Sequence, residues 1–331
     1  MVDVSVLMPI YKGEQHLKEA IDSILNQSFK NFEFVIINDA SLDNSEKIIL
    51  SYNDIRIVYK KHEQNKGLVG ALNSGLEICK GKYIARMDQD DIADLNRLQL
   101  QFDFMEKNPD YILLGGQATI IDSKDKLQNP ISDEGIRAKL VFATSFVHPT
   151  VMLRKAMLDK NNLSYSENYK HAEDYGFWID LASHGKMANL PETCLYYRRH
   201  EAQYTVVFNE DMVKMVKKIR AKYLDNNNIK LNSTDLNLLE IITERRIEYA
   251  NEKLVKDIGD FLSKLSSYFK NSSIDEIEVK KIVCQIWNKT CSARMNLGFP
   301  IYSLYVSNSL AFSRFNLKTH LHFLKSDLTR K

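Results

Sequence analysis

The segment Asp88-Gln-Asp90-Asp91 carries three carboxylates within four residues. Such groups repel one another unless solvent or a cation neutralises them. The segment directly follows a β-rich run at 83–87, where burial limits access to solvent. Oxygen ligands that leave coordination positions open suit Mg²⁺ or Mn²⁺ holding a diphosphate. The spacing therefore predicts a metal site, and the alternative is an acidic turn in which Asp91 caps the next helix.

A second acidic pair, Glu173 and Asp174, stands at the expected start of a helix that contains Trp178. These acids could cap the helix and complement its dipole. Beside a metal site, one of them could instead act as a general base. Two histidines lie in ambiguous segments: His200 in a charged stretch typical of solvated side chains, and His148 before a β-like run, where packing is the expected role.

Strand-like and helix-like segments alternate in the first half of the chain. The expected strands are 4–8, 32–37, 55–59, 83–87 and 112–114, and apolar residues recur at helical spacing between them. This alternation predicts an α/β fold with a mainly parallel sheet flanked by helices. Such sheets bind ligands beyond the carboxyl ends of their strands. The clusters at 9–11, 38–39 and 88–91, which follow expected strands, should therefore converge on one crevice.

The second half of the chain has a helical pattern. We expect residues 1–205 to form the catalytic domain and residues 206–331 to form a helical region packed on it. Residues 301–331 hold five basic residues against one acidic residue, together with a leucine stripe. This basic tail could bind an anionic membrane surface, or its leucines could pack on the domain with the charges outward. Both interpretations remain open.

Composition and missing motifs exclude several classes of protein. A formal charge of +2 gives no global basic field for nucleic acid. Four scattered cysteines without a C-x-x-C pair indicate reduced thiols. The first residues lack a basic leader, and no apolar run reaches the ~18 residues that cross a bilayer, so a cytoplasmic location is expected. The dinucleotide-binding, P-loop, H-E-x-x-H and G-x-S-x-G patterns are absent.

Seven motifs in order resemble the glycosyltransferases of family 2, which have the GT-A fold. The resemblance covers about residues 2–205, and its motifs lie at 9–11, 34–43, 65–67, 85–91, 148–150, 172–175 and 197–200. One departure is Lys12, where many members have asparagine. The fold implied is a Rossmann-like, mainly parallel sheet flanked by helices, with a helical C-terminal extension.

The resemblance implies how a nucleotide would bind. Asp39 would accept the N3–H of uracil, with Pro9 and Tyr11 beside the base. Lys66 and Arg86 would reach the nucleotide. These assignments come from the matched motifs and not from spacing.

The resemblance also implies the metal ligands and the base. Asp88 would lie by the ribose and the metal, Asp90 would bind the Mn²⁺ or Mg²⁺ that bridges the diphosphate, and His200 would complete the metal shell. Asp174 would deprotonate the acceptor hydroxyl, with Glu173 as the alternative base.

The implied activity is metal-dependent, inverting transfer of a hexose or N-acetylhexosamine from a UDP-sugar. The acceptor would be a hydroxyl of an oligosaccharide or lipid-linked glycan in bacterial lipooligosaccharide, O-antigen or capsule, and the product a β-linkage. β-1,3-N-acetylhexosaminyltransferases are among the similar enzymes. The enzyme would be cytoplasmic, and peripheral on the inner face of the plasma membrane if the tail binds lipid.

Two other functions stay open at this point. A sugar-phosphate nucleotidyltransferase has a similar sheet but needs a Gly-rich, Arg-bearing loop after the first strand, where this chain has Pro-Ile-Tyr-Lys-Gly-Glu at 9–14. A non-catalytic nucleotide-binding protein could use the same fold.

Overall fold

A computed structural model describes residues 2–123, 125–199, 210–244 and 246–311. The chain divides into two compact units. The sheet unit comprises residues 1–136 and 144–216, and the helical unit comprises residues 137–143 and 217–331. The boundary expected at residue 205 lies outside the described residues.

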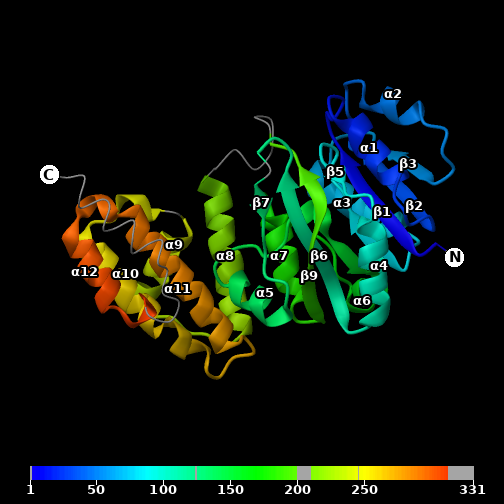
Figure 1. The fold of residues 1–331 in the computed structure, drawn as a ribbon. Coiled ribbons are helices and arrows are strands. Elements are labelled where there is room, and N and C mark those ends of the chain that lie inside the picture. The colour runs from blue at the N-terminus through cyan, green and yellow to red at the C-terminus, as the bar shows by residue number, and fades with distance from the viewer. Residues whose placement is uncertain (1, 124, 200–209, 245, 312–331) are drawn as a thin grey trace. The chain divides into compact units, whose positions relative to one another are not determined.

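The sheet unit alternates strands and helices, as the sequence predicts (Figure 1). Its strands are β1 (Val4–Ile10), β2 (Phe32–Asn38), β3 (Ile57–Lys61), β4 (Tyr83–Arg86), β5 (Ile92–Ala93), β6 (Tyr111–Ile120), β7 (Lys126–Leu127), β8 (Met152–Arg154) and β9 (Lys186–Tyr197). The helices up to residue 181 are α1 (Leu17–Leu25), α2 (Ser45–Leu50), α3 (Gly67–Ile78), α4 (Arg97–Lys107), α5 (Asp133–Leu140), α6 (Lys155–Asn161) and α7 (Glu173–Leu181).

The described strands form one sheet in the order β3-β2-β1-β4-β8-β6-β9-β5, with β7 paired to β6. Neighbours are parallel from β3 to β4 and again between β6 and β9. The short strand β8 runs antiparallel to both β4 and β6, so it joins the two parallel blocks. The third strand begins two residues later than expected, because Ile55 is fully exposed before the chain enters the sheet.

The central strands are buried on both faces, which explains their almost continuous apolar sequences. Every residue of β1 and β2 is buried. One face packs against α1 and α4 through side chains such as Ile21 and Leu98. The other face packs against α3, where a Cβ on Gly75 would lie 2.1 Å from Cδ1 of Leu7. Glycine is therefore required there for the helix to approach the strand.

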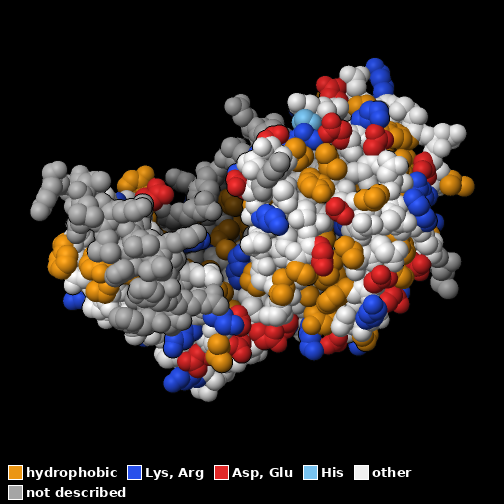
Figure 2. Space-filling model, in the orientation of Figure 1, with side chains coloured by type: hydrophobic (Ala, Val, Ile, Leu, Met, Phe, Trp, Pro, Cys, Tyr) orange, Lys and Arg blue, Asp and Glu red, His pale blue; other side chains and the backbone are white. Residues whose placement is uncertain are grey.

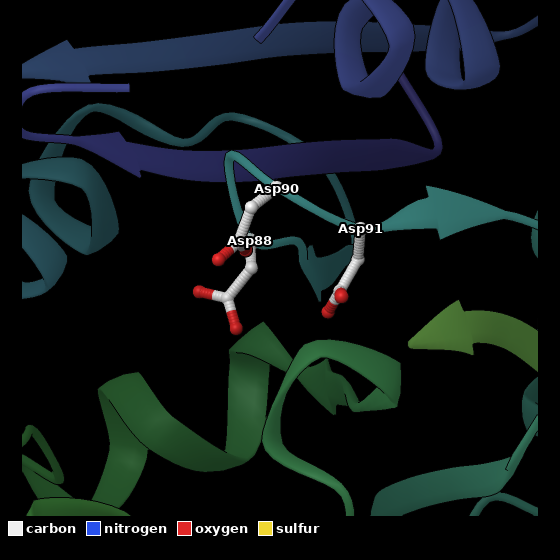
Figure 3. A group of neighbouring side chains, drawn as sticks. All are labelled: Asp88, Asp90 and Asp91. Carbon is white, nitrogen blue, oxygen red and sulfur yellow. The ribbon is translucent and has the colours of Figure 1, made fainter. Parts of the chain in front are cut away.

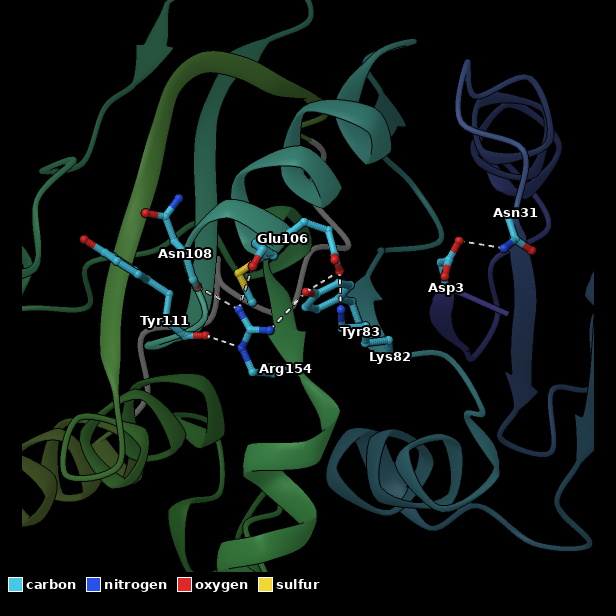
Figure 4. A network of polar contacts seen from close by, with 9 residues as sticks. Asp3, Asn31, Lys82, Tyr83, Glu106, Asn108, Tyr111 and Arg154 are labelled. Atoms are coloured by element: carbon cyan, nitrogen blue, oxygen red, sulfur yellow. Dashed lines mark hydrogen bonds and ion pairs between the residues drawn. The ribbon is translucent and has the colours of Figure 1, made fainter. Parts of the chain in front are cut away.

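A buried arginine joins the elements at one end of the sheet. Arg154 Nε donates to the Tyr111 carbonyl over 2.8 Å, one Nη donates to the Asn108 carbonyl over 2.8 Å, and the other donates to the Tyr83 hydroxyl over 3.0 Å. Tyr83 in turn donates to Glu106 over 2.7 Å (Figure 4). Because Tyr83 is the first residue of β4, this network fixes the edge opposite to the one that carries Asp88.

The helical unit has its own apolar core. Helix α8 (Glu210–Asn226) begins in the sheet unit and continues into the helical unit. The helices that follow it are α9 (Ser233–Thr243), α10 (Glu252–Leu265), α11 (Glu276–Ala293) and α12 (Phe299–Ser307). Helices α10 and α11 approach closely at Gly259, whose hypothetical Cβ would lie 2.8 Å from the ring of Trp287. Buried Asp235 accepts from the Tyr268 hydroxyl over 2.6 Å and pairs with Lys264 over 2.8 Å.

Charged side chains of both signs are interspersed over the face of the sheet unit drawn in Figure 2, in keeping with the chain's nearly balanced charge. Within the described ranges, no helix combines the length and the apolar composition needed to span a bilayer. The α/β fold with a mainly parallel sheet, predicted from the sequence, is confirmed.

Candidate active site

Three strand ends meet at one edge of the sheet, as the sequence predicts. Ile10 at the end of β1 is in register with Asn38 at the end of β2, and Leu7 of β1 is in register with Arg86 at the end of β4. The Asp39 backbone N–H also donates to the Ile10 carbonyl over 2.8 Å. The loops after these strands therefore start side by side.

The end of β1 presents an aromatic side chain to solvent. Pro9 is buried inside the strand, whereas Tyr11, just beyond it, is 44% exposed. Lys12 adopts a positive φ of 51° and its ammonium lies 5.2 Å from the centre of the Tyr11 ring. The backbone N–H of Lys12 donates to Ser41 Oγ over 3.1 Å, which joins this turn to the loop after β2. An exposed ring at a strand end suits stacking against a base.

Asp39 is buried and already holds two hydrogen bonds. Its Oδ1 accepts from His62 Nδ1 over 2.7 Å and from the Lys66 backbone N–H over 2.8 Å. Asn65 donates to its carbonyl over 3.2 Å, and the next residue, Ala40, has a positive φ of 58°. The described contact of Lys66 is thus made by its backbone, and its side chain is exposed.

The acidic loop between β4 and β5 gathers three carboxylates. One ligand oxygen from each of Asp88, Asp90 and Asp91 lies within 4.8 Å of the others, and Figure 3 shows all three side chains on this loop. Burial, followed by the charges of its two neighbours, raises the pKa of Asp91 to about 8. Burial also raises the pKa of Asp88, against the opposing effect of Arg86.

This loop fits a hard divalent cation. The ligands are oxygens only, and Asp91 Oδ2 is buried without a hydrogen-bond partner. Carboxylates whose charged forms are disfavoured in the free protein gain most from a nearby cation. Asp91 does not cap a helix: its Oδ1 accepts from the backbone N–H of Arg198 over 2.9 Å. Mn²⁺ and Mg²⁺ both match this donor set.

Arg198 links the end of β9 to the acidic loop by hydrogen bonds. Besides its backbone contact with Asp91, its Nε donates to the Asp90 carbonyl over 2.9 Å, and its guanidinium pairs with Glu19. His200, expected to complete a metal shell, lies two residues further on and outside the described residues.

Arg86 is a buried cation that pairs with the acidic loop and acts electrostatically on the acids of α7. One Nη pairs with Asp88 Oδ1 over 2.5 Å, whereas Nε and Nη1 are buried without a partner. Its positive charge opposes the rise in pKa of both Glu173 and Asp174. Arg86 therefore brings a buried positive charge and donors without partners next to the acidic loop.

The second acidic pair begins α7. Glu173 is buried, and burial together with the charge of Asp174 raises its pKa to about 7. Asp174 is half-buried, and its Oδ1 accepts from the Tyr175 backbone N–H over 2.6 Å. The charge of Asp88 contributes to the pKa shift of Glu173. A candidate metal ligand and a candidate base are thus close enough to influence each other electrostatically.

A family model and a curated relative identify this chain. The model for Glycosyl transferase family 2 matches residues 5–162. An uncharacterised glycosyltransferase of Haemophilus influenzae is 30% identical over 283 residues, which are 80% of this chain and 87% of the relative. The chain belongs to glycosyl transferase family 2. The protein is therefore a transferase enzyme.

Other similar proteins are also named as glycosyltransferases. The UDP-Glc:alpha-D-GlcNAc-diphosphoundecaprenol beta-1,3-glucosyltransferase WfgD of Escherichia coli is 30% identical over 59% of this chain and 70% of its own length. The putative glycosyltransferase EpsE of Bacillus subtilis is 32% identical over 60% of this chain and 73% of its own length.

Solved structures share the fold of this family 2 transferase. TarS residues 1–349 of S. aureus, in complex with UDP-GlcNAc, matches with a TM-score of 0.60 at 17% identity over 94% of this chain and 90% of that TarS fragment. The mannosyltransferase PcManGT of Pyrobaculum calidifontis, in complex with GDP-Man and Mn²⁺, matches with a TM-score of 0.55 at 13% identity over 97% and 86% of the two chains. These likenesses establish the GT-A fold.

The candidate site also contains contacts not predicted from the sequence. His148, expected only to pack, forms a 2.9 Å hydrogen bond with the Tyr165 hydroxyl, and burial and the charge of Arg86 keep its pKa well below 6.5. His62 contacts Asp39, and Gln89 contacts Tyr11. The position of Gln89 inside the acidic motif was a usable signal, but no local pattern marked His62 or Tyr165.

Proposed function

We propose that this family 2 glycosyltransferase is metal-dependent and inverting, and that it transfers a hexose or N-acetylhexosamine from a UDP-sugar. The proposal rests above all on Arg86. This buried guanidinium pairs with Asp88 and its charge acts on Glu173 and Asp174, so it connects the candidate metal ligands with the candidate base. A transferase of this kind needs both functions at one sugar carbon.

Asp88 and Asp90 would hold Mn²⁺ or Mg²⁺, with His200 as a further ligand. The bound cation would supply Lewis-acid stabilisation of the negative charge that develops on the diphosphate. The unsatisfied N–H groups of Arg86 would add hydrogen bonds to the same oxygen-rich leaving group. Ordered donors in a site that excludes water stabilise developing charge without reorganisation.

Asp174 would act as the base. In an inverting reaction the acceptor hydroxyl attacks the anomeric carbon as the bond to the diphosphate breaks, and a carboxylate takes the hydroxyl proton. Asp174 is half-buried and therefore more accessible to an acceptor than buried Glu173. The pKa of Glu173, raised to about 7, leaves much of this carboxyl protonated near neutrality and unable to accept a proton, so Glu173 is only the alternative base.

The donor would be a UDP-sugar bound at Asp39. Pro9, Tyr11 and the backbone of Lys66 surround the strand ends where a base would lie. TarS was solved with UDP-GlcNAc and WfgD is named for UDP-Glc, which supports uridine. The name of WfgD also supports a lipid-linked acceptor and a β-linkage.

We infer from these names that the acceptor is a growing bacterial surface glycan, either an oligosaccharide or a lipid-linked chain. The enzyme would then be cytoplasmic. The basic tail would contact the inner face of the plasma membrane, although its residues 312–331 lie outside the described part of the chain.

A donor screen tests the proposal. The full chain would be incubated with Mn²⁺, a panel of nucleotide sugars and diphosphoundecaprenol-linked sugar acceptors, and release of UDP and formation of glycoside would be measured. We expect turnover with at least one UDP-sugar and none in excess EDTA. Release of pyrophosphate from a nucleoside triphosphate would instead indicate a nucleotidyltransferase. Binding of UDP without turnover on any acceptor would indicate a non-catalytic protein.

A further inference from the structure

His62 is a buried side chain to which the proposed reaction gives no role. It follows β3 directly, and its side chain is 2% exposed. Its Nδ1 lies 2.7 Å from Asp39 Oδ1, and its Nε2 lies 3.0 Å from Ser74 Oγ on α3. His62 thus connects the carboxylate after β2 with a helix on the face of the sheet.

The partners of the imidazole determine its proton positions. A carboxylate only accepts hydrogen bonds, so Nδ1 carries a proton and donates it to Asp39. In the neutral imidazole Nε2 then accepts from the Ser74 hydroxyl. Ser74 thereby fixes the ring orientation and the tautomer.

Both donors to the Asp39 side chain act on the same oxygen. His62 Nδ1 and the Lys66 backbone N–H each contact Oδ1, and neither contact uses Oδ2. Two donors on one oxygen prevent the carboxylate from rotating, so the second oxygen keeps one direction. A fixed acceptor of this kind distinguishes a base that offers an N–H from one that offers a lone pair.

We propose that His62 is a positioning residue that, supported by Ser74, holds Asp39 for the imide N3–H of uracil and so sets the preference for uridine over cytidine nucleotides. This inference rests on the proposed UDP-sugar activity. Cytosine carries a lone pair at N3, which would face the carboxylate oxygen and leave both acceptors without a proton between them. The fold alone does not select the base, because TarS was solved with UDP-GlcNAc and PcManGT with GDP-Man.

The test compares the binding of UDP and CDP by calorimetry, with Mn²⁺ present and the full chain as the protein. His62→Asn keeps a donor near the position of Nδ1, whereas His62→Gln places its amide near Nε2 and loses the donor to Asp39. His62→Leu removes both contacts at similar volume. We expect the wild type to prefer UDP by about a hundredfold or more, since sites built to hydrogen-bond one group reject analogues that lack it.

We expect UDP binding to depend on whether a variant keeps a hydrogen-bond donor to Asp39. His62→Gln and His62→Leu should weaken UDP binding about tenfold or more and reduce the UDP/CDP ratio, because a hydrogen bond to a charged group is lost. His62→Asn should retain both the affinity and the ratio within about threefold. At saturating donor, kcat should change less than the KM for the donor in all three variants. If His62→Leu fails to fold, the Asn and Gln variants alone decide the question.

Ser5→Ala is the matched control for loss of a buried hydrogen bond. Ser5 Oγ donates to Glu33 over 2.6 Å inside the same sheet, away from the strand ends of the site. The control should lower stability without changing the UDP/CDP ratio. Equal ratios in the wild type, His62→Gln and His62→Leu would overturn the role of His62. Absence of UDP binding by the wild type would instead contradict the proposed function.

Discussion

The side-chain amide of Gln89 and the backbone of Tyr11 exchange two hydrogen bonds across 78 residues of sequence. The Tyr11 N–H donates to Oε1 over 2.9 Å, and Nε2 donates to the Tyr11 carbonyl over 3.0 Å. Gln89 lies between Asp88 and Asp90, so this pair links the acidic loop to the end of β1. A Cβ on Gly13 would lie 2.6 Å from Gln89 Oε1, and the glycine therefore leaves room for the amide.

We expect Gln89→Ala to lower kcat/KM for the donor about tenfold, because two hydrogen bonds that align the acidic loop are lost. Gly13→Ala should have a similar effect by displacing the amide. If both act through the same contact, the double variant should be no worse than Gln89→Ala alone. Steady-state kinetics of the single and double variants measure this. Additive losses would show that the glycine acts separately. Gln99→Ala, which removes an exposed hydrogen bond to Asp103 on α4, is the control.

Loss of a candidate metal ligand should be severe. Asp90→Asn should reduce turnover at least about a hundredfold, because Lewis-acid stabilisation of the leaving group is worth several kcal/mol. Manganese titration by calorimetry should show weaker binding in the variant. Asp103→Asn, on α4, replaces an acid outside the cluster and serves as the control. Full turnover of the wild type in excess EDTA would contradict the metal assignment.

Substitutions of the two acids that begin α7 should have different effects on transfer. Asp174→Asn should reduce transfer by about 10²–10⁴-fold, the usual contribution of a general base, while UDP binding is nearly unchanged. Single-turnover kinetics and UDP calorimetry provide the two measurements. A variant Asp174→Asn with normal transfer beside an inactive Glu173→Gln would reverse the assignment. Activity in both variants would exclude this pair as the base.

The raised pKa of Glu173 predicts a pH-dependent stability. Because its pKa in the folded protein is about 7 rather than the ordinary 4.5, the folded state binds more protons than the unfolded state between these values. Stability should therefore fall as pH rises through this window, by up to about 3 kcal/mol. Denaturant unfolding without metal should show that Glu173→Gln removes much of the fall. The exposed acid control, Glu167→Gln, should keep the wild-type profile.

The basic tail should bind anionic membrane in a salt-sensitive way. Each basic residue near an anionic leaflet contributes on the order of 1 kcal/mol, and residues 301–331 contain five. Full-length protein should sediment with anionic vesicles but not with neutral ones, and high salt should release it. A chain shortened after Ser309 should remain folded and unbound. Unfolding of the shortened chain, or equal binding by both, would favour a tail packed on the protein.

Part of the site was predictable because its signals are local. Burial on both faces gives β1 and β2 continuous apolar sequences, and the polar residues directly after them must lie at one sheet edge. The adjacency of the carboxylates at 88–91 is likewise a property of the chain alone. The β-like run after His148 corresponds to β8, but a strand of three residues gives no sign that it runs antiparallel to both of its neighbours.

The sequence by itself therefore determined the α/β class, the sheet edge that carries the site, and the acids that stand there. Only the tertiary structure decided which groups those acids contact. Asp39 Oδ1 contacts His62, which follows β3, and Asp91 Oδ1 accepts from the backbone N–H of Arg198. Two guanidinium nitrogens of Arg86 have no hydrogen-bond partner. Hydrophobic periodicity reports burial one segment at a time. Hydrogen-bond partners tens of residues apart depend on strand register and side-chain direction, which exist only once the sheet has assembled.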